Sequence, residues 1–247
     1  MFETYKKRFS LKTHLNRLGD LTAFEIVENT YYLVDFLNSE VQVYNLDWTF
    51  KKIQKLPISA SYDLIHVDKH LFVMSQKYFY KMDTDFNLVA KSSVHTILGL
   101  TYRHMYYDNL SSNFYTTLPG SKSIEVFNKN LSIIKTIVTN HLLYSINGYK
   151  GTIFASTLLN NKILLIQNDQ VVKSIIFNQC ESSPYIKFSF DSFGNIAVIC
   201  NFKLNLYDYF GNYVKSYPSF DVLNKIFYRS DSEGRLISVG KTIEIYY

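Results

Sequence analysis

The chain has 247 residues, of which 47% are hydrophobic, 17% aromatic and 19% charged. A chain of this length can bury a sizeable core, and a composition so rich in aromatic residues excludes disorder for most of it. The net charge of +5 comes from scattered Lys and Arg, which indicates a solvated surface rather than a dedicated nucleic-acid groove. The 21 Tyr and 19 Phe favour strands over helices.

The ends and the cysteines exclude several classes of protein. The first residues, MFETYKKR, contain no apolar h-region, so we expect no secretory signal. No apolar run approaches the roughly 18 residues of a transmembrane helix, so we expect no membrane insertion. The two cysteines, Cys180 and Cys200, are too few for a disulfide scaffold or a four-cysteine zinc site. We expect a soluble protein made in a reducing compartment, where both cysteines are free thiols.

One short pattern recurs from the first part of the chain to its end: apolar, any residue, apolar, large apolar, and usually Asp, Asn or Gln. The fourth residues of its copies are Tyr44, Met82, Phe127, Ile166, Tyr207 and Tyr246. Their successive spacings are 38, 45, 39, 41 and 39 residues. Because the apolar residues alternate with period two, the repeat is built of strands and not of helices. A strand repeat of about 40 residues predicts the blades of a β-propeller.

Each repeat accommodates four strands, which in the first repeat are predicted at 21–27, 30–36, 40–46 and 49–56. Asp and Asn follow the third strand in most repeats, and these residues close tight turns with their own side chains. An Asp-x-x-Gly pattern occurs three times, at 191–194, 208–211 and 231–234. We interpret all three as hairpin turns, since a calcium loop needs more oxygen ligands at alternating positions.

The chain ends after the third strand of the sixth repeat and begins with a strand that belongs to no repeat. That strand contains Thr4-Tyr5-Lys6-Lys7, which resembles Thr49-Phe50-Lys51-Lys52 in the fourth strand of the first repeat. We therefore expect residues 3–10 to pair with 241–247 and to complete the last blade, leaving no open sheet edge there.

These patterns predict an all-β fold, a single six-bladed β-propeller of four-stranded antiparallel blades closed by the N-terminal strand. The whole chain, 1–247, then forms one domain. The predicted blades are 20–57, 58–94, 95–139, 140–178, 179–219, and 220–247 together with 1–12.

The two-hairpin rhythm of residues 190–198 and 206–214 resembles the NHL-type blade of the six-bladed propeller superfamily. The Gly-His and Trp-Asp marks of WD repeats are absent. The resemblance implies a docking surface for proteins, or in some members RNA. Other six-bladed propellers are lactonases, lyases, sialidases or glycan binders, and propellers also occur in the tail nozzles of short-tailed phages. Fold membership does not choose among these functions.

A search for catalytic motifs finds no phosphate loop, no His-Glu-x-x-His and no Gly-x-Ser-x-Gly. The interblade connections would carry five metal-capable residues around one mouth of the channel: His14, His95, His141, Cys180 and Asp221. Equivalent positions on opposite blades are too far apart to share one ion, so we expect no metal and no cofactor.

The third repeat is about six residues longer than its neighbours, and the excess falls within 95–111. Two interpretations of its tyrosines stay open, an interface and the core of an inner strand. Tyr and Arg are favoured interface anchors. The candidate binding residues are Tyr102, Arg103, Tyr106, Tyr107, His95 and His141.

The leading functional hypothesis is a non-enzymatic protein-interaction or structural module, a subunit of a larger assembly such as a virion tail, located in the cytoplasm or in the virion. The first alternative is a carbohydrate- or RNA-binding propeller, which would use aromatic stacking beside basic residues. The second is a propeller enzyme of lactonase, lyase or glycosidase type, for which acids and histidine would converge in the channel.

Overall fold

The structure is a computed structural model of the whole chain. It describes residues 7–12, 21–58, 61–75, 78–92, 104–181, 183, 186–191, 193–201, 203–218, 227–230, 236–239 and 242–246. None of the helices in this part of the chain has the length and the hydrophobicity needed to cross a bilayer.

The described residues form strands and one short 3-10 helix, η1 (Asn178–Cys180). The strands are β1 (Lys7–Lys12), β2 (Leu21–Val27), β3 (Thr30–Asp35), β4 (Glu40–Asn45), β5 (Phe50–Lys55), β6 (Ser61–Val67), β7 (His70–Ser75), β8 (Phe79–Asp83), β9 (Leu88–Lys91), β10 (His104–Asp108), β11 (Asn113–Thr117), β12 (Ser123–Phe127), β13 (Ile133–Val138), β14 (Leu143–Tyr149), β15 (Thr152–Thr157), β16 (Lys162–Gln167), β17 (Gln170–Ile176), β18 (Lys187–Phe190), β19 (Ile196–Cys200), β20 (Lys203–Tyr207), β21 (Tyr213–Pro218), β22 (Phe227–Ser230), β23 (Leu236–Val239) and β24 (Thr242–Tyr246).

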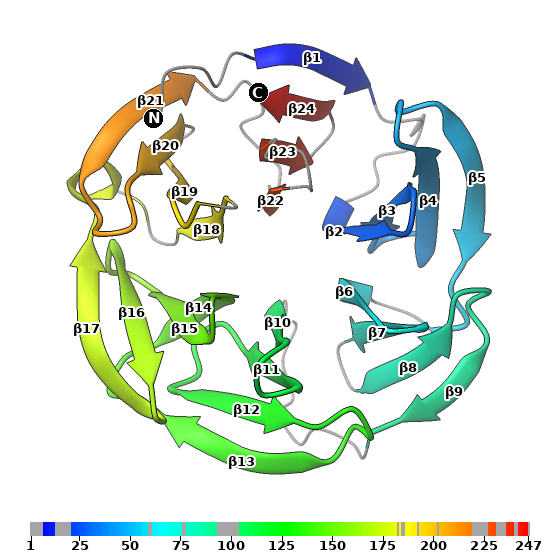
Figure 1. The fold of residues 1–247 in the computed structure, drawn as a ribbon, viewed down its shortest axis with the longest axis horizontal. Coiled ribbons are helices and arrows are strands. Elements are labelled where there is room, and N and C mark those ends of the chain that lie inside the picture. Colours follow the sequence, from blue (N-terminus) through cyan, green and yellow to red (C-terminus); the bar gives the residue numbers. More distant parts are fainter. Residues whose placement is uncertain are drawn as a thin grey trace.

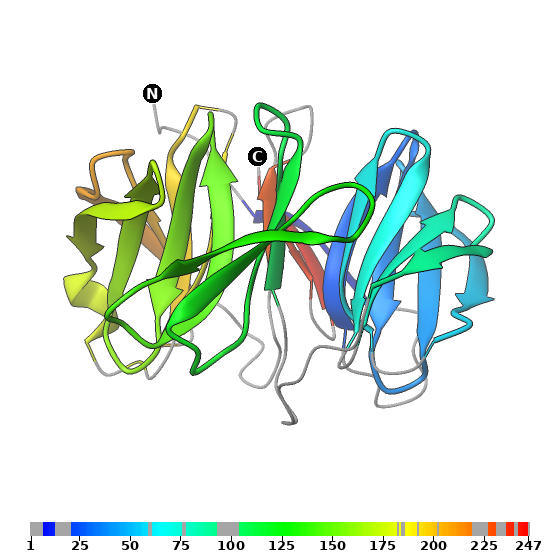
Figure 2. The same cartoon turned by 90° about the horizontal axis from the view of Figure 1, so that it is seen from below.

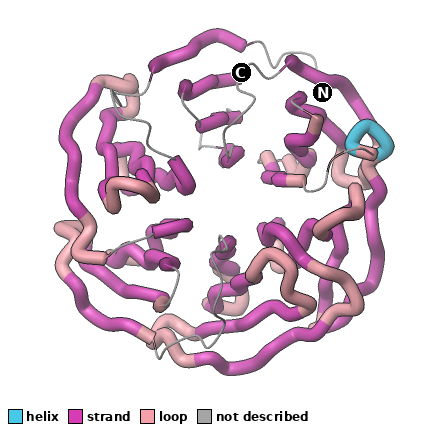
Figure 3. Tube along the Cα trace, turned by 180° about the vertical axis from the view of Figure 1, so that it is seen from behind, coloured by secondary structure: helices cyan, strands magenta, loops and turns pink. Residues whose placement is uncertain are grey.

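Four-stranded antiparallel sheets stand around a central opening, as Figures 1 and 3 show from opposite sides. Among the described strands there are six such sheets, ordered from the channel outward as β2–β5, β6–β9, β10–β13, β14–β17, β18–β21 and β22-β23-β24-β1. The side view of Figure 2 shows turns and connections at both ends of the ring. The expectation of an all-β propeller of four-stranded antiparallel blades is confirmed.

The repeat pattern marks the third strand of each sheet. Its fourth residues lie in β4, β8, β12, β16, β20 and β24. Those with described side chains are almost completely buried: Tyr44, Met82, Phe127, Ile166 and Tyr207. A large apolar residue recurs there because the equivalent position in every blade fills the space between that sheet and the next one.

The last blade is closed by the two ends of the chain. β1 pairs antiparallel with β24, with Lys7 opposite Tyr246 and Lys12 opposite Thr242. In Figure 1, β1 lies at the circumference outside β24. The predicted pairing of the termini is confirmed for residues 7–10 with 244–246, and β1 runs two residues beyond the predicted segment. Residues 3–6, 241 and 247 of that prediction lie outside the described residues.

Five turns share one geometry, set by an Asp or Asn at the first position. The amide of residue one bonds to the carbonyl of residue five, and the amide of residue four bonds back to the carbonyl of residue one. The first residues of these turns are Asn45, Asp83, Asn128, Asp191 and Asp208. All five therefore close through backbone hydrogen bonds within the turn, as expected of hairpin turns that begin with Asp or Asn. The third Asp-x-x-Gly turn, at 231–234, lies outside the described residues.

The fourth residue of each of these turns has a positive φ. Glycine occupies it at Gly194 and Gly211, where φ is 89° and 93°. Trp48, Phe86 and Leu131 occupy it in the other turns with φ between 64° and 67°. A non-glycine residue in this region costs about 1–2 kcal/mol. The three side chains are buried in the cores, and this burial offsets the cost.

The innermost strands are tied to one another by side-chain hydrogen bonds. Thr22 Oγ1 on β2 donates to the Ser61 carbonyl on β6, at 3.0 Å. Asp63 Oδ2 on β6 accepts from the Met105 amide on β10, at 2.9 Å. Ser145 Oγ on β14 donates to the Ile186 carbonyl beside β18, at 3.3 Å. Neighbouring blades are thus held together near the channel by directional bonds as well as by apolar packing.

Replacing Gly148 by Ala is expected to lower the free energy of unfolding by about 1–3 kcal/mol through overpacking. A Cβ at this position of β14 would overlap Cε1 and Cζ of Tyr106, whose ring packs across from the neighbouring blade. Urea unfolding measures the loss. The double variant Gly148→Ala with Tyr106→Ala should lose less free energy of unfolding than the two single variants lose together. The reason is that removal of the Tyr106 ring frees the space that the new Cβ occupies. A Gly148→Ala variant as stable as the parent would contradict this packing.

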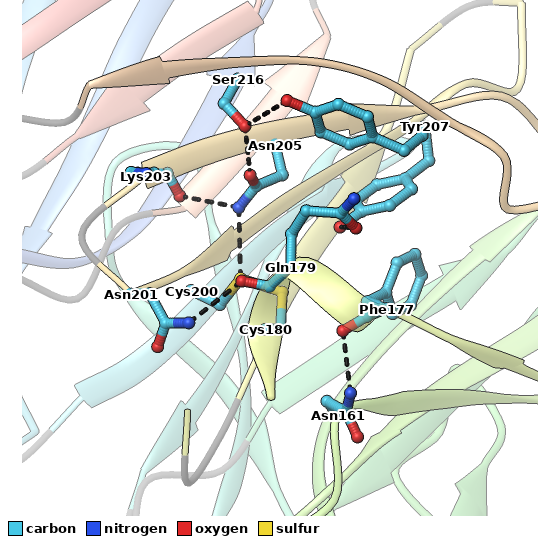
Figure 4. The surroundings of a disulfide bond; sticks show 11 residues. Asn161, Phe177, Gln179, Cys180, Cys200, Asn201, Lys203, Asn205, Tyr207 and Ser216 are labelled. Carbon is cyan, nitrogen blue, oxygen red and sulfur yellow. Dashed lines mark hydrogen bonds between the residues drawn. A yellow bond between two sulfur atoms is a disulfide. The ribbon is translucent and has the colours of Figure 1, made fainter. Parts of the chain in front are cut away.

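The two cysteines form a disulfide, Cys180–Cys200, so the expectation of free thiols is wrong. Their Cα atoms are 5.4 Å apart, although 20 positions separate them in sequence. Cys180 ends η1 in the connection between two blades, and that connection folds back against the end of β19 (Figure 4). Disulfides persist mainly in oxidising surroundings. The cysteines therefore give no support to a reducing compartment.

Further bonds fasten the η1 segment to the same blade (Figure 4). The Gln179 carbonyl accepts from Asn201 Nδ2 at 3.0 Å, and Gln179 Oε1 accepts from the Tyr207 hydroxyl at 3.1 Å. The rings of Phe177 and Tyr207 pack edge to face with centroids 4.4 Å apart. The disulfide thus reinforces a connection that is already bound by polar and aromatic contacts.

Candidate interaction face

One end of the ring carries the turns between first and second strands and those between third and fourth strands. The third residue of the shared five-residue turn lies at the tip. It is Asp47, Asp85 and Asn130 in three of these turns, all exposed or near the surface. In the two turns of the blade β18–β21 it is Phe193 and Phe210, which are 78% and 70% exposed. Since the same geometry accepts polar residues elsewhere, the turn itself does not require phenylalanine.

A third apolar tip lies on the same end of the ring. Leu110 follows Asp108 in the β10–β11 turn, where its amide bonds to Asp108 Oδ1 at 3.3 Å, and its side chain is 78% exposed. Leu110, Phe193 and Phe210 are among the most exposed large apolar side chains of the described residues. Large apolar groups gathered on one surface are typical of binding sites.

The three tips are connected by packed residues on the blades between them. Leu110 lies against Gly151, where a Cβ would come within 2.7 Å of its Cδ1. Tyr149 lies against Gly194, and its ring is 5.9 Å from that of Tyr209, which in turn neighbours Phe210 at 5.9 Å. We call these residues the apolar turn face: Leu110, Tyr149, Phe193, Tyr209 and Phe210. Its close contacts need glycine at 194, where a side chain would also strain the backbone.

The same end of the ring is acidic over the blades β2–β5 and β6–β9. Exposed carboxylates there belong to Glu28, Asp47, Asp68 and Asp85, and one exposed lysine, Lys69, lies beside Asp68. Hydrogen bonds from Thr49 lower the pKa of Asp47, and the bond from Lys129 at 2.7 Å lowers the pKa of Asp68. Both groups are therefore ionised at neutral pH. A ligand that covers this end would meet an apolar half and a negatively charged half.

Two of the predicted binding residues, Tyr106 and Tyr107, lie on the inner strand β10 and are partly buried. The Tyr106 ring packs against Gly148, and burial, with a smaller contribution from Asp108, raises the pKa of its hydroxyl. The Tyr107 ring packs on Phe114, with centroids 4.8 Å apart, and lies under Lys129. Both rings fill space between strands, which favours the core interpretation of this segment.

The other predicted site residues do not meet in one place among the described residues. His141 lies in the connection before β14, at the end of the ring opposite the apolar turn face. Burial and then Lys162 lower its pKa, so the ring is neutral at physiological pH.

His95, Tyr102 and Arg103 lie outside the described residues, as do His14 and Asp221 of the proposed ring of metal-capable groups. Cys180 is bound in the disulfide and is not available as a thiolate ligand. The described residues contain no group of three metal-capable side chains.

Polar residues recur at one level of the channel. Asp63, His104 and Lys187 occupy matching positions on β6, β10 and β18, and Ser145 lies at that level on β14. All four are buried. Both Asp63 oxygens accept backbone amides, from Leu64 and Met105 at 2.9 Å, and Ser145 Oγ bonds with Ser156 Oγ at 2.6 Å. Asp63 and Ser145 are thus engaged in holding blades together.

Comparison with known proteins addresses the fold and not the function. No protein-family model matches the chain, and no curated protein matches its sequence. Among solved structures, "Crystal structure of WD40 beta propeller domain of Doa1" matches with a TM-score of 0.70 and 12% identity, covering 100% of this chain and 97% of that one. The chain has the β-propeller fold.

A second match is "Streptogramin B lyase structure", with a TM-score of 0.71, 9% identity and coverage of 99% of both chains. At such identities the similarity extends to the fold alone, and the two matched proteins belong to different functional classes by name. The NHL-type resemblance stays a prediction. The function of this propeller has to be inferred from its own surface.

Proposed function

We propose that this propeller is a non-enzymatic protein-interaction module that docks a protein partner on the apolar turn face. The observation that supports it is the identity of the tip residues. One turn geometry holds Asp or Asn at its tip in three turns but Phe193 and Phe210 in two, beside the exposed Leu110. Exposed aromatic tips on a rigid scaffold supply the apolar centre of a protein interface, and loops are where such scaffolds place recognition.

The charge on this end of the ring favours a protein over a nucleic acid as the ligand. The carboxylates of Glu28, Asp47 and Asp85 would face the phosphates of any polymer that spread beyond the apolar half, whereas Asp68 is paired with Lys129. Carboxylates repel phosphates, and contacts to phosphates supply most of the affinity of proteins for nucleic acids. These carboxylates would therefore weaken the binding of a nucleic acid. A protein partner could place apolar residues on the apolar turn face and basic residues beside the carboxylates of the neighbouring blades. The module would act as a subunit of a larger assembly such as a virion.

The variant Phe193→Asp with Phe210→Asp tests this function, because Asp occupies the same tip position in two other turns. We expect the fold to be kept, with stability changed by no more than about 0.5 kcal/mol. Binding to the protein that co-purifies with the tagged parent from the native source should weaken by about 2–4 kcal/mol, since two anchors are lost.

The matched control is Leu37→Asp with Leu159→Asp. These two leucines are also more than half exposed but lie in turns at the opposite end of the ring. Thermal melts and quantitative pull-downs of both variants make the comparison. Unchanged binding of the phenylalanine variant, with loss in the leucine variant, would assign the interface to the other end.

A further inference from the structure

The outermost strand of every blade lacks acidic residues. Within the described bounds of β1, β5, β9, β13, β17 and β21 there are ten Lys or Arg, three each in β1 and β5 and one in each of the others. The same strands contain no Asp and no Glu, although the chain has 21 acidic residues. The outer strands, which lie at the circumference of the ring in Figure 1, therefore contain ten basic residues and no acidic one, while the chain as a whole has a net charge of only +5.

Lysines on an edge strand ordinarily protect it from pairing with another strand. That explanation suits β5, in which Lys51, Lys52 and Lys55 occupy half of the strand. It does not suit β17, which has seven residues and a single lysine, Lys173. Val172 and Ile176 on β17 are 54% and 60% exposed, and Val171 is exposed beside them.

β17 is also the outer member of a tight hairpin. Gln167 pairs directly with Gln170, and the pairing with β16 continues to Lys162 and Ile176. Among the described strands no neighbour pairs with the outer side of β17, so its backbone donors and acceptors on that side face outward. The adjacent outer strand β13 also exposes aliphatic residues, but its Lys135 is held by Asp169 at 2.7 Å. β17 thus combines an open edge, exposed aliphatic side chains and a lysine.

A second copy of this chain is a poor occupant for the edge. Pairing two circumferences would bring lysine against lysine with no acidic residue on either outer strand to compensate. An extended segment with its own carboxylates would instead pair them with Lys173 and with the positive charge of the rim. Its backbone would bond to the open edge, and its aliphatic residues would cover Val172 and Ile176.

We propose that the outer edge of β17 accepts an extended segment of a partner protein, in which aliphatic residues alternate with Asp or Glu, as a fifth strand of the blade. This site lies on the circumference and is separate from the apolar turn face. Either one can therefore fail without the other.

The probe is a fluorescein-labelled peptide of four Val-Glu repeats, with two matched peptides, four Val-Lys repeats and a Val-Glu peptide carrying two prolines. Fluorescence anisotropy measures binding to the full-length protein. We expect the Val-Glu peptide to bind about tenfold more tightly than either matched peptide, because one lacks the carboxylates and the other lacks backbone donors. Amide hydrogen exchange should slow in residues 170–176 on peptide addition and stay unchanged in β5.

The protein variant Val172→Lys with Ile176→Lys places further lysines on the edge, and Ile53→Lys on β5 is the control. The β17 variant should weaken Val-Glu binding about tenfold, although its added charge would strengthen a merely electrostatic attraction. The control should bind as the parent does. The proposal is overturned if the β17 variant binds equally or better, if the Val-Glu peptide does not bind, or if protection falls on other strands. It is overturned as well if the parent self-associates in sedimentation and the β17 variant does not.

Discussion

Deletion of residues 1–12 is expected to destabilise the protein strongly. The deletion removes β1 and leaves β24 as an open edge with unpaired backbone groups. Five residue pairs join the two strands, and the net loss should be about 5 kcal/mol at roughly 1 kcal/mol for each hydrogen bond. Such a loss would lower the melting temperature by about 15 °C for a chain of this size, or cause aggregation on expression.

A further sample makes this measurement specific. A synthetic peptide of residues 1–12 added to the truncated protein should raise the melting temperature again, since it can occupy the vacant edge. A truncated protein that melts like the parent would show that β1 does not close the ring.

Loss of the Cys180–Cys200 disulfide is expected to have the second largest effect. The bond closes a loop with a sequence separation of 20, for which the chain-entropy estimate is about 3 kcal/mol. In a chain of this size that corresponds to a fall of about 6–12 °C in the melting temperature. The double variant Cys180→Ala with Cys200→Ala and the two single variants should lose similar amounts, because each lacks the same bond.

A thiol reagent added to the denatured parent without reductant provides the direct check. The parent should show no free thiol until it is reduced, while each single variant should show one. If the denatured parent reacts without reduction, the two cysteines were thiols in the protein sampled, and the variants should then melt close to the parent.

The architecture could be predicted because it repeats. The alternating pattern around Tyr44, Met82 and Phe127 marks the same strand in successive blades, and a period of about 40 residues fits a blade. Pairing of the chain ends could also be predicted from the sequence. The last repeat has only three strands and the N-terminal strand belongs to no repeat, so the N-terminal strand can serve as the missing fourth strand.

The disulfide and the apolar turn face were not predictable in the same way. Cys180 meets Cys200 only because a connection between blades folds back onto β19, a contact that no local pattern encodes. The apolar tips did leave a signal. Phe193 and Phe210 precede the glycines of two Asp-x-x-Gly turns, and a comparison of all turns at that position would have separated them from Asp47 and Asp85.

Photo-crosslinking from the turn tips tests the proposed docking face most directly. Benzoylphenylalanine placed at position 193 or 210 would sit on the apolar turn face, and the same group at position 159 would sit at the opposite end of the ring. The protein carrying each label is expressed in its native source and irradiated. Docking on the apolar turn face predicts one discrete adduct, with the same protein, from 193 and from 210, and none from 159. The same adduct from 159, or no adduct from 193 and 210, would contradict it.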